Sequence, residues 1–148
     1  MMNLEFNVEG TPVPKARARV VMRGKYPGAY TPQKSKNYET IVADAARLAM
    51  NEAGLSMTSE PCGVSLIFSL PIPKSASKKQ VKCMSNGEKM HIKKPDLDNL
   101  IKQVFDAMNG IVWCDDSQVV SVTAIKVYSE VPSASIRIVG INKGDSDE

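Results

Sequence analysis

Two aspartates separated by a single residue stand where an irregular, lysine-rich stretch gives way to an amphipathic pattern. Asp96 and Asp98 come directly after Lys93, Lys94 and Pro95, and the apolar residues behind them recur at helical spacing. Where a chain is extended, alternate side chains lie on the same side, so the two carboxylates could share one cation. Mg²⁺ takes oxygen ligands in octahedral geometry and commonly uses only a few carboxylates, which leaves positions for water and a substrate phosphate. The pair is therefore a candidate magnesium site.

A lysine and a second acidic pair could complete such a site. Lys102 follows Asp98 by four residues, one helical turn along the same face, and could contact a phosphate held by the metal. Asp115 and Asp116 come directly after the short apolar run 111–113, where the end of a strand could bring a third carboxylate to the first two. Carboxylates gathered in one place repel one another, and a bound cation compensates that charge.

Each of these features also has a simpler interpretation. On spacing alone, a helix-capping role for Asp96 or Asp98 is the commoner one, because a carboxylate at a helix start accepts backbone N–H bonds and suits the positive end of the helix. Lys102 alone would be an exposed helical lysine, and residues 115–117 alone would be a turn. The catalytic interpretation depends on the coincidence of these features in one lysine-rich chain that has few other catalytic groups.

Charge is unevenly distributed along the 148 residues, although the net charge is only +3. Residues 1–40 hold seven Lys and Arg against three acids, residues 73–94 hold seven Lys against one acid, and residues 95–120 hold five Asp against one Lys. A solvated surface explains most such runs. The more specific interpretation is that the basic stretches bind a polyanion, because Lys and Arg neutralise nucleic-acid phosphates. The predicted DNA-binding residues are Lys15, Arg17, Arg19, Lys93 and Lys94, of which the first three point to one side if their segment is extended.

Several classes of protein are disfavoured. Cys62, Cys83 and Cys114 are odd in number and form no Cys-x-x-Cys pair, which argues against a disulfide framework or a zinc knuckle. His91 is the only histidine, so His-ligated zinc chemistry lacks its ligands, and no serine stands in a nucleophile-elbow motif. No apolar run approaches the roughly 20 residues of a membrane span, and the first residues do not resemble a signal peptide. We therefore expect a cytoplasmic protein without a membrane partner.

The elements predicted around these residues form an α+β fold, with one domain over residues 1–148 and a frayed tail at 142–148. Apolar residues at three-and-four spacing predict two main helices, over 33–53 and 97–108, with one further helical turn around 78–83. Period-two alternation and β-prone composition predict five strands, at residues 4–10, 20–22, 64–70, 118–128 and 134–141. We expect a loop at 24–28, a hairpin between the last two strands through 130–133, and one mixed sheet with the two helices packed against it.

Three blocks of sequence carry a resemblance to a known family. They are residues 94–102 (KPDLDNLIK), 105–113 (FDAMNGIVW) and 115–120 (DDSQVV). Together they closely resemble the RusA family of Holliday junction resolvases, which phages and prophages often carry. Residues 12–19 and 30–38 are also similar to the phage-type branch, so the resemblance covers most of the chain apart from 74–92 and the tail. The family's fold agrees with the predicted mixed sheet and two helices.

The resemblance implies roles for individual residues. In the family, the Asp-x-Asp pair and the second Asp of the Asp-Asp element are the catalytic, metal-associated acids, and the lysine of Asp-Asn-x-x-Lys is needed for cleavage. The matching positions here are Asp96, Asp98, Asp116 and Lys102. Asp115 is a neighbouring candidate. Cys114 departs from the pattern, because we expect a basic or polar residue before the acidic pair.

The implied function is a Mg²⁺-dependent endodeoxyribonuclease, with Mn²⁺ as an alternative ion, that resolves Holliday junctions by paired symmetric nicks in DNA recombination and repair. Paired cuts need two active sites, so we expect a homodimer bound to branched DNA. Two rival functions remain open. A non-catalytic module that grips branched DNA is disfavoured, because carboxylates facing phosphates weaken binding unless a metal neutralises them. A magnesium nuclease for flaps or single strands shares these features, because the choice of branch depends on the shape of the dimer.

Overall fold

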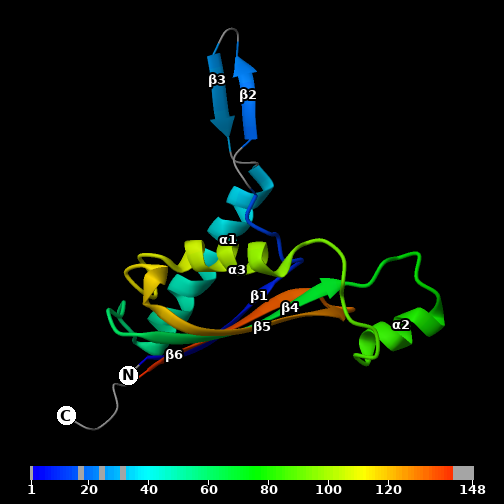
Figure 1. The fold of residues 1–148 in the computed structure, drawn as a ribbon. Helices are drawn as coiled ribbons and strands as arrows, with labels where there is room; N and C mark the ends of the chain where they lie inside the picture. The colour runs from blue at the N-terminus through cyan, green and yellow to red at the C-terminus, as the bar shows by residue number, and fades with distance from the viewer. Residues whose placement is uncertain (1, 17–18, 24–25, 31–32, 142–148) are drawn as a thin grey trace.

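The computed structural model describes residues 2–16, 19–23, 26–30 and 33–141 of the chain, and of residues 19–23 and 26–30 it describes the backbone alone. Among these residues, no helix is long and apolar enough to cross a membrane. The architecture is a single α+β arrangement, in which helices cover one face of a mixed sheet (Figure 1). The fold class predicted from the sequence is thereby confirmed.

A four-stranded sheet forms the base of the molecule. Its strands are β1 (Asn3–Glu9), β4 (Cys62–Pro71), β5 (Val119–Ser129) and β6 (Ser133–Gly140), in the spatial order β1-β6-β4-β5. β6 pairs antiparallel with β1 and with β4, whereas β4 and β5 are parallel. The sheet is therefore mixed, and β1 and β5 are its edges.

The predicted hairpin between the last two strands is wrong. Only residues 130–132 connect β5 to β6, yet β4 lies between these two strands and pairs with both. β4 has buried side chains along most of its length, so it gains most from a neighbour on each side, whereas β5 is largely exposed and occupies an edge. Consecutive strands are often but not always neighbours, and here the burial of β4 overrides adjacency in the chain.

A second, two-stranded sheet consists of β2 (Arg19–Arg23) and β3 (Tyr26–Tyr30), which are antiparallel, with Arg19 opposite Tyr30. The loop predicted over 24–28 is therefore too long, because residues 26–28 belong to β3, while 24–25 lie outside the described residues. Figure 1 shows this hairpin apart from the four-stranded sheet.

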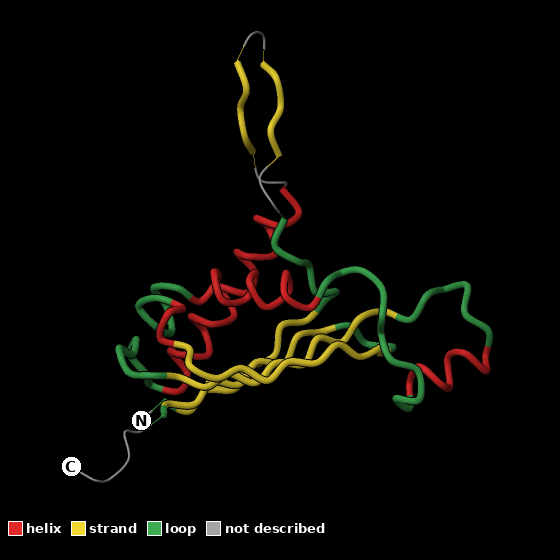
Figure 2. The backbone as a smooth tube through the Cα atoms, in the orientation of Figure 1, coloured by secondary structure: helices red, strands yellow, loops and turns green. Residues whose placement is uncertain are grey.

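Both predicted main helices are present, as α1 (Gln33–Ala53) and α3 (Leu97–Met108). They lie together on one face of the four-stranded sheet (Figure 2). The lysine-rich segment between β4 and α3 contains a further helix, α2 (Lys78–Ser85), which is longer than the predicted single turn. A reciprocal capping box explains its extent, since Ser77 accepts from the backbone N–H of Gln80, whose side chain accepts from the backbone N–H of Ser77.

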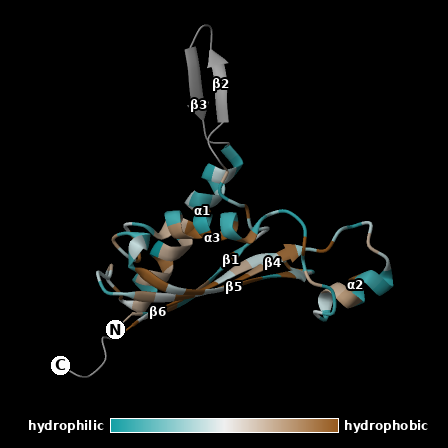
Figure 3. Cartoon of the chain, in the orientation of Figure 1, coloured by the Kyte–Doolittle hydropathy of each residue, from teal (hydrophilic) through white to brown (hydrophobic). Residues whose placement is uncertain are grey.

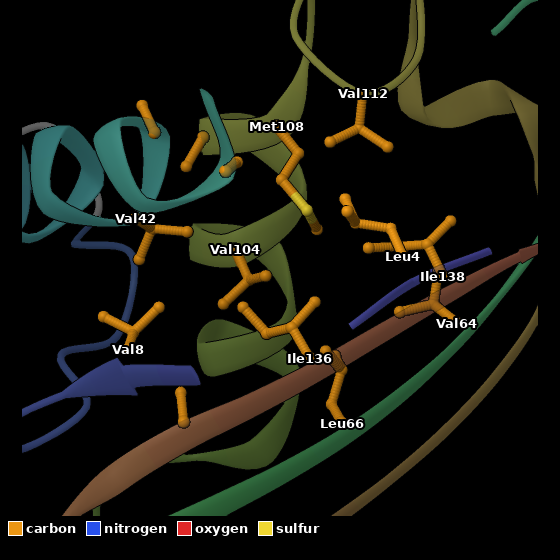
Figure 4. Close-up of a cluster of buried hydrophobic side chains, with 14 of the residues drawn as sticks. Leu4, Val8, Val42, Val64, Leu66, Val104, Met108, Val112, Ile136 and Ile138 are labelled. Atoms are coloured by element: carbon orange, nitrogen blue, oxygen red, sulfur yellow. The ribbon is translucent and has the colours of Figure 1, made fainter. Parts of the chain in front are cut away.

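The hydrophobic core lies between the two main helices and the sheet. Figure 3 shows that α1 and α3 each have a hydrophilic and a hydrophobic side. The close-up in Figure 4 shows side chains of α1, α3 and three strands pointing toward one another, among them Val42, Val104, Met108, Leu66 and Ile136. The other face of the sheet carries no helix, and its Ile67 and Ile125 are 46% and 40% exposed.

A buried polar contact fixes the two helices to each other inside this core. Gln103 on α3 is 0% exposed, and its side-chain Nε2 donates to the backbone oxygen of Ser35 at 2.9 Å and to its Oγ at 3.1 Å. Ser35 Oγ also accepts from the backbone N–H of Ala16 at 3.2 Å. A buried amide that loses its partner destabilises a protein, so this contact specifies how α3 sits on α1. The start of α3 is thereby placed relative to the N-terminal segment.

Two neighbouring residues of β4 test which face of the four-stranded sheet is packed against the helices and which is open. Phe68 is 0% exposed in the core, and Phe68→Ala should lower the free energy of unfolding by about 3–5 kcal/mol, because it removes buried contacts and leaves a cavity. Ile67→Ala on the open face should cost no more than about 1 kcal/mol, the range of strand propensity. Urea denaturation of the two variants checks both values. Equal losses would contradict the assignment of the faces.

Candidate active site

Asp96 occupies the position that precedes the first residue of α3. Its backbone is extended, with φ −72° and ψ 139°, and its carbonyl accepts the first helical hydrogen bond, from the N–H of Leu100 at 3.1 Å. The capping interpretation therefore predicted the position correctly, but the carboxylate makes no capping hydrogen bond. Its Oδ2 lies 3.2 Å from Nζ of Lys94, whose side chain is 86% exposed. Among the residues that the structure describes, the Asp96 carboxylate is thus bound only by an exposed lysine, which a ligand can displace.

Asp98 lies in the first turn of the same helix and is exposed. One of its carboxylate oxygens, Oδ1, accepts from the backbone N–H of Asn99 at 3.0 Å. Leu97, between the two acids, packs against the hydrophobic core, so the acids flank a residue that faces inward. The positive end of the helix favours negative charge at both positions. Two oxygen donors of this kind suit a divalent ion such as Mg²⁺, which takes few protein carboxylates.

The segment that leads into Asp96 is held by strand β5. Nζ of Lys126 donates to the backbone oxygens of Lys93 at 2.8 Å and of Pro95 at 2.9 Å. Two residues further along β5, the ring of Tyr128 contacts that of His91, with centroids 4.8 Å apart. Burial, and then the charge of Lys126, lower the pKa of His91 and so favour its neutral imidazole. His91 is thus a packing residue of this segment.

Lys102 belongs to an ion-pair network on the outer side of α3. Its Nζ lies 3.2 Å from Oδ1 of Asp106, and the Lys102 side chain is 62% exposed. Oδ2 of Asp106 lies 3.4 Å from Nζ of Lys15, which pairs with Glu39 of α1 at 2.7 Å. Burial lowers the pKa of Lys15, but the hydrogen bond and charge of Glu39 and the charge of Asp106 outweigh it, so the pKa is raised overall. Lys15, predicted to bind DNA, is therefore engaged between the two helices.

The second acidic pair divides into a structural and a free residue. Asp115 caps the short 3-10 helix η1 (Asp116–Gln118), because its carboxylate accepts from the backbone N–H of Ser117 at 3.1 Å. Hydrogen bonds from Ser117 lower the pKa of Asp115. The Gln118 side chain anchors this turn by donating to the backbone oxygens of Thr58 at 2.9 Å and Glu60 at 3.1 Å. The predicted turn is present, and Asp116 is the acid that it leaves available.

The structure does not bring Asp116 to the first pair within one chain. α3 has 12 residues, which at 1.5 Å of rise per residue is about 18 Å; Asp96 precedes its start, and η1 lies near its end (Figure 1). The reason is local: Trp113 is fully buried, and its Nε1 donates to Asn109 Oδ1 at 2.7 Å, so the chain turns tightly there and keeps Asp116 near the end of α3. The strand that follows, β5, then returns to the start of α3, where Lys126 contacts Lys93 and Pro95. Across 2–16 and 33–141, no three His, Cys, Asp or Glu side chains lie close enough to hold a metal.

The basic residues predicted to bind DNA are only partly described. Lys93 and Lys94 are exposed beside Asp96, whereas Arg17 lies outside the described residues and Arg19 is described by its backbone alone. A groove of about 350 Å³ runs past this point. Lys34 at the start of α1, which no sequence motif singled out, lines that groove. The lining residues are Thr11, Pro12, Val13, Pro14, Lys34, Lys94, Pro95, Asp96 and Asn99.

One family model and one protein of known sequence match most of the chain. The family model described as "Endodeoxyribonuclease RusA" matches residues 9–139, a span that contains all of the candidate site residues. A protein of Bacillus subtilis (strain 168), named "Uncharacterized protein YqaN", is 34% identical over 137 residues, which are 91% of this chain and 94% of that protein.

Proposed function

The chain belongs to the RusA family of endodeoxyribonucleases, hydrolases that act on Holliday junctions, and from this premise we propose that it makes paired, symmetric, Mg²⁺-dependent nicks in such junctions during DNA recombination and repair. The observation that carries this proposal is the carboxylate pair at the start of α3. Asp96 has no capping bond and Asp98 is exposed, so both can take a ligand. In a DNA-cleaving family, a divalent ion that binds a phosphate is the ligand that suits them.

Asp96 and Asp98 would hold the ion, and their oxygen atoms suit Mg²⁺ and Mn²⁺ alike. When bound, the ion supplies positive charge for the scissile phosphate and lowers the pKa of a water. Attack of water on phosphorus, in line with the P–O3′ bond, breaks that bond and leaves a 5′-phosphate and a 3′-hydroxyl.

Lys102 would stabilise the charge that develops on the phosphate or on the leaving oxygen. It lies one helical turn after Asp98 on the same side of α3. Its ion pair with Asp106 is largely exposed on the lysine side, and exposed pairs contribute little stability, so a phosphate can replace the carboxylate at small cost. A cation placed beforehand near the reacting phosphate stabilises the transition state more than the ground state.

We propose that the working unit is a homodimer and that each active site combines residues of both subunits. Asp116 lies at the far end of α3 from Asp96, next to the start of edge strand β5, where Val120 and Val122 are 63% and 45% exposed. Exposed apolar residues at a sheet edge favour contact with another chain. In a two-fold dimer, if Asp116 of the partner subunit reaches one Asp96–Asp98 pair, the reciprocal contact forms by symmetry. Two identical sites then face the two matching strands of a junction.

The DNA backbone would run along the groove beside Asp96. Lys34 and Lys94 line this groove, Lys93 adjoins Lys94 in the chain, and Arg17 and Arg19 would add positive charge from the N-terminal segment. Lys15 acts differently, because its ammonium joins Glu39 and Asp106 and its backbone N–H donates to Asn99 O at 2.9 Å. It therefore fixes the chain at its own position, two residues before Arg17 in the sequence.

Replacing the acids tests the catalytic assignment. Asp96→Asn, Asp98→Asn or Asp116→Asn should each slow cleavage of a labelled four-way junction about a hundredfold or more while leaving junction binding intact, because each removes a charge at the site but no basic residue. Asp115→Asn is the matched control, since asparagine caps a helix about as well as aspartate. Parent protein should cut the junction with Mg²⁺ and not with EDTA. A near-parental rate in any of the three variants would remove that residue from the site, and preferred cutting of a flap would support the rival nuclease.

Mixed dimers test the shared active site. Co-expression of an Asp96→Asn chain and an Asp116→Asn chain with different affinity tags allows the mixed dimer to be isolated. If Asp116 acts across the interface, one site of this dimer keeps both Asp96 and Asp116 and the other has lost both, so the dimer should nick one strand of a junction. If all acids act within one chain, both sites are damaged and no nick forms. Light scattering should report about twice the 16.1 kDa chain mass for the parent.

The salt dependence of binding tests the DNA path. Each phosphate contact changes the logarithm of affinity by roughly 0.9 per logarithm of salt for B-form DNA. Replacing both Lys93 and Lys94 with Ala should make the plot of log affinity against log salt less steep, by the amount expected for about two phosphate contacts. Replacing Arg17 and Arg19 with Ala should have a similar effect. Arg137→Ala is the control, because Arg137 is exposed on the face of β6 that points away from the helices. A slope that changes only with Arg137 would place the DNA on the opposite face.

A further inference from the structure

Lys126 is a charged residue in the row of β5 side chains that lies on the core side of the sheet. β5 pairs with β4 so that Ala124, Lys126 and Tyr128 share a row with the buried Leu66, Phe68 and Leu70. A lysine on the inner row of a sheet is costly unless its ammonium is satisfied. None of the carboxylates in the described part of the chain pairs with it, and its partners are the two backbone oxygens before α3. Departures from patterning of this kind concentrate at functional sites.

The two contacts of Lys126 determine the orientation of Asp96. The oxygen of Pro95 belongs to the planar peptide unit that contains the nitrogen of Asp96, so the 2.9 Å hydrogen bond from Lys126 fixes the peptide before Asp96. The peptide after Asp96 is fixed by the helix, through the 3.1 Å bond from the N–H of Leu100. With both flanking peptides held, the backbone of Asp96 is fixed, and with it the direction in which its side chain leaves the chain at the start of α3. The carboxylate itself has no helix-capping bond that would do the same.

The hydrogen bond from Lys126 to the backbone oxygen of Lys93 also restrains the exposed residues before Asp96. Lys93 and Lys94 are exposed, so packing does little to hold the chain there. A hydrogen bond from a charged donor is shorter and stronger than a neutral one, and Lys126 makes one at each end of this stretch, at 2.8 Å and 2.9 Å. The ring contact of His91 with Tyr128 also places this segment on β5, but it lies two residues before Lys93.

We propose that Lys126 is a positioning residue for the metal site: by fixing the segment before α3, it sets how tightly the Asp96–Asp98 pair binds a divalent ion. This inference rests on the proposed function, since it takes that pair as the metal ligands. Lys126 does not touch the substrate or the ion. Its role is comparable to that of residues that orient metal ligands through hydrogen bonds, whose loss typically weakens metal binding about 10- to 100-fold.

Replacing Lys126 has two effects, and they change the affinity for the metal ion in opposite directions. Removal of a positive charge near a cation site should, by charge alone, tighten cation binding. Loss of a positioning contact should weaken it. Lys126→Met removes the charge and the hydrogen bonds together and keeps a similar length of apolar chain, so the direction of the change in metal affinity separates the two effects.

The experiment measures Mn²⁺ binding to the purified full-length protein, without DNA, by the loss of the electron paramagnetic resonance signal of free Mn²⁺. Lys126→Met should raise the dissociation constant about 10- to 100-fold, and Lys126→Arg, which keeps a charged donor, should restore most of the affinity. Lys79→Met on α2 is the control, because it removes the same charge from an exposed residue. Hydrogen exchange of the Leu100 amide should quicken in Lys126→Met. Urea unfolding identifies folded variants, and Lys126→Gln replaces Lys126→Met if the latter does not fold.

The outcomes separate this inference from the function on which it rests. If Asp96→Asn abolishes Mn²⁺ binding but folded Lys126→Met binds as the parent does, or more tightly, the positioning role is wrong and the metal site stands. If Lys79→Met weakens binding as much as Lys126→Met, the effect is not specific and the positioning role is again wrong. If Asp96→Asn binds Mn²⁺ like the parent, or the parent does not bind it, the proposed metal site fails and this inference fails with it.

Discussion

The packing of the inner face of α3 onto the sheet and α1 is the constraint on which the rest of this structure depends. Leu100, Val104 and Met108 are buried on that face, and Gln103 adds a hydrogen bond to Ser35 that further restricts the rotation of the helix. Once that rotation is fixed, the remaining positions follow from helical geometry. The outer side carries Lys102, and the start of the helix carries two acids whose intervening residue faces the core. The same apolar contacts that stabilise the fold therefore aim the polar residues outward.

Much of this fold could be predicted from the sequence, because its main helices are defined by local patterns. Apolar spacing predicted both main helices with the bounds that the structure shows, over 33–53 and 97–108. Strand pairing was less accessible, since it depends on residues far apart in the chain. Nothing within residues 118–141 indicates that β4, more than 40 positions earlier, separates the last two strands. The hairpin error is thus an error of non-local contact, while the assignment of those residues to strands is confirmed.

In the candidate site, too, the residues of local motifs could be predicted from the sequence, whereas those that depend on contacts between distant segments could not. The acids and Lys102 belong to compact motifs, so their identity as candidates followed from residue spacing and from the resemblance to a family. Lys126 contacts residues 31 and 33 positions away, and Lys34 shares a groove with Asp96 only because α1 and α3 pack together. No spacing rule identifies either residue. The distance between Asp116 and the Asp96–Asp98 pair could likewise not be predicted from a local pattern, because it depends on the tight turn around Trp113.

The four acids of the two motifs show how surroundings give one residue type different functions. Asp115 has its carboxylate satisfied by a backbone N–H of its own turn, and its lowered pKa reflects that bond, so a ligand would have to break local structure to reach it. Asp96 stands at an equivalent capping position, yet it makes no such bond, and its carboxylate pairs with the exposed Lys94. The positive, N-terminal end of α3 still favours its charge through the helix dipole, which acts without occupying the oxygen atoms. A divalent ion requires carboxylate oxygens that stay available. On this criterion, Asp96, Asp116 and the second carboxylate oxygen of Asp98, whose Oδ1 accepts from Asn99, are ligand candidates, while Asp115 serves the fold.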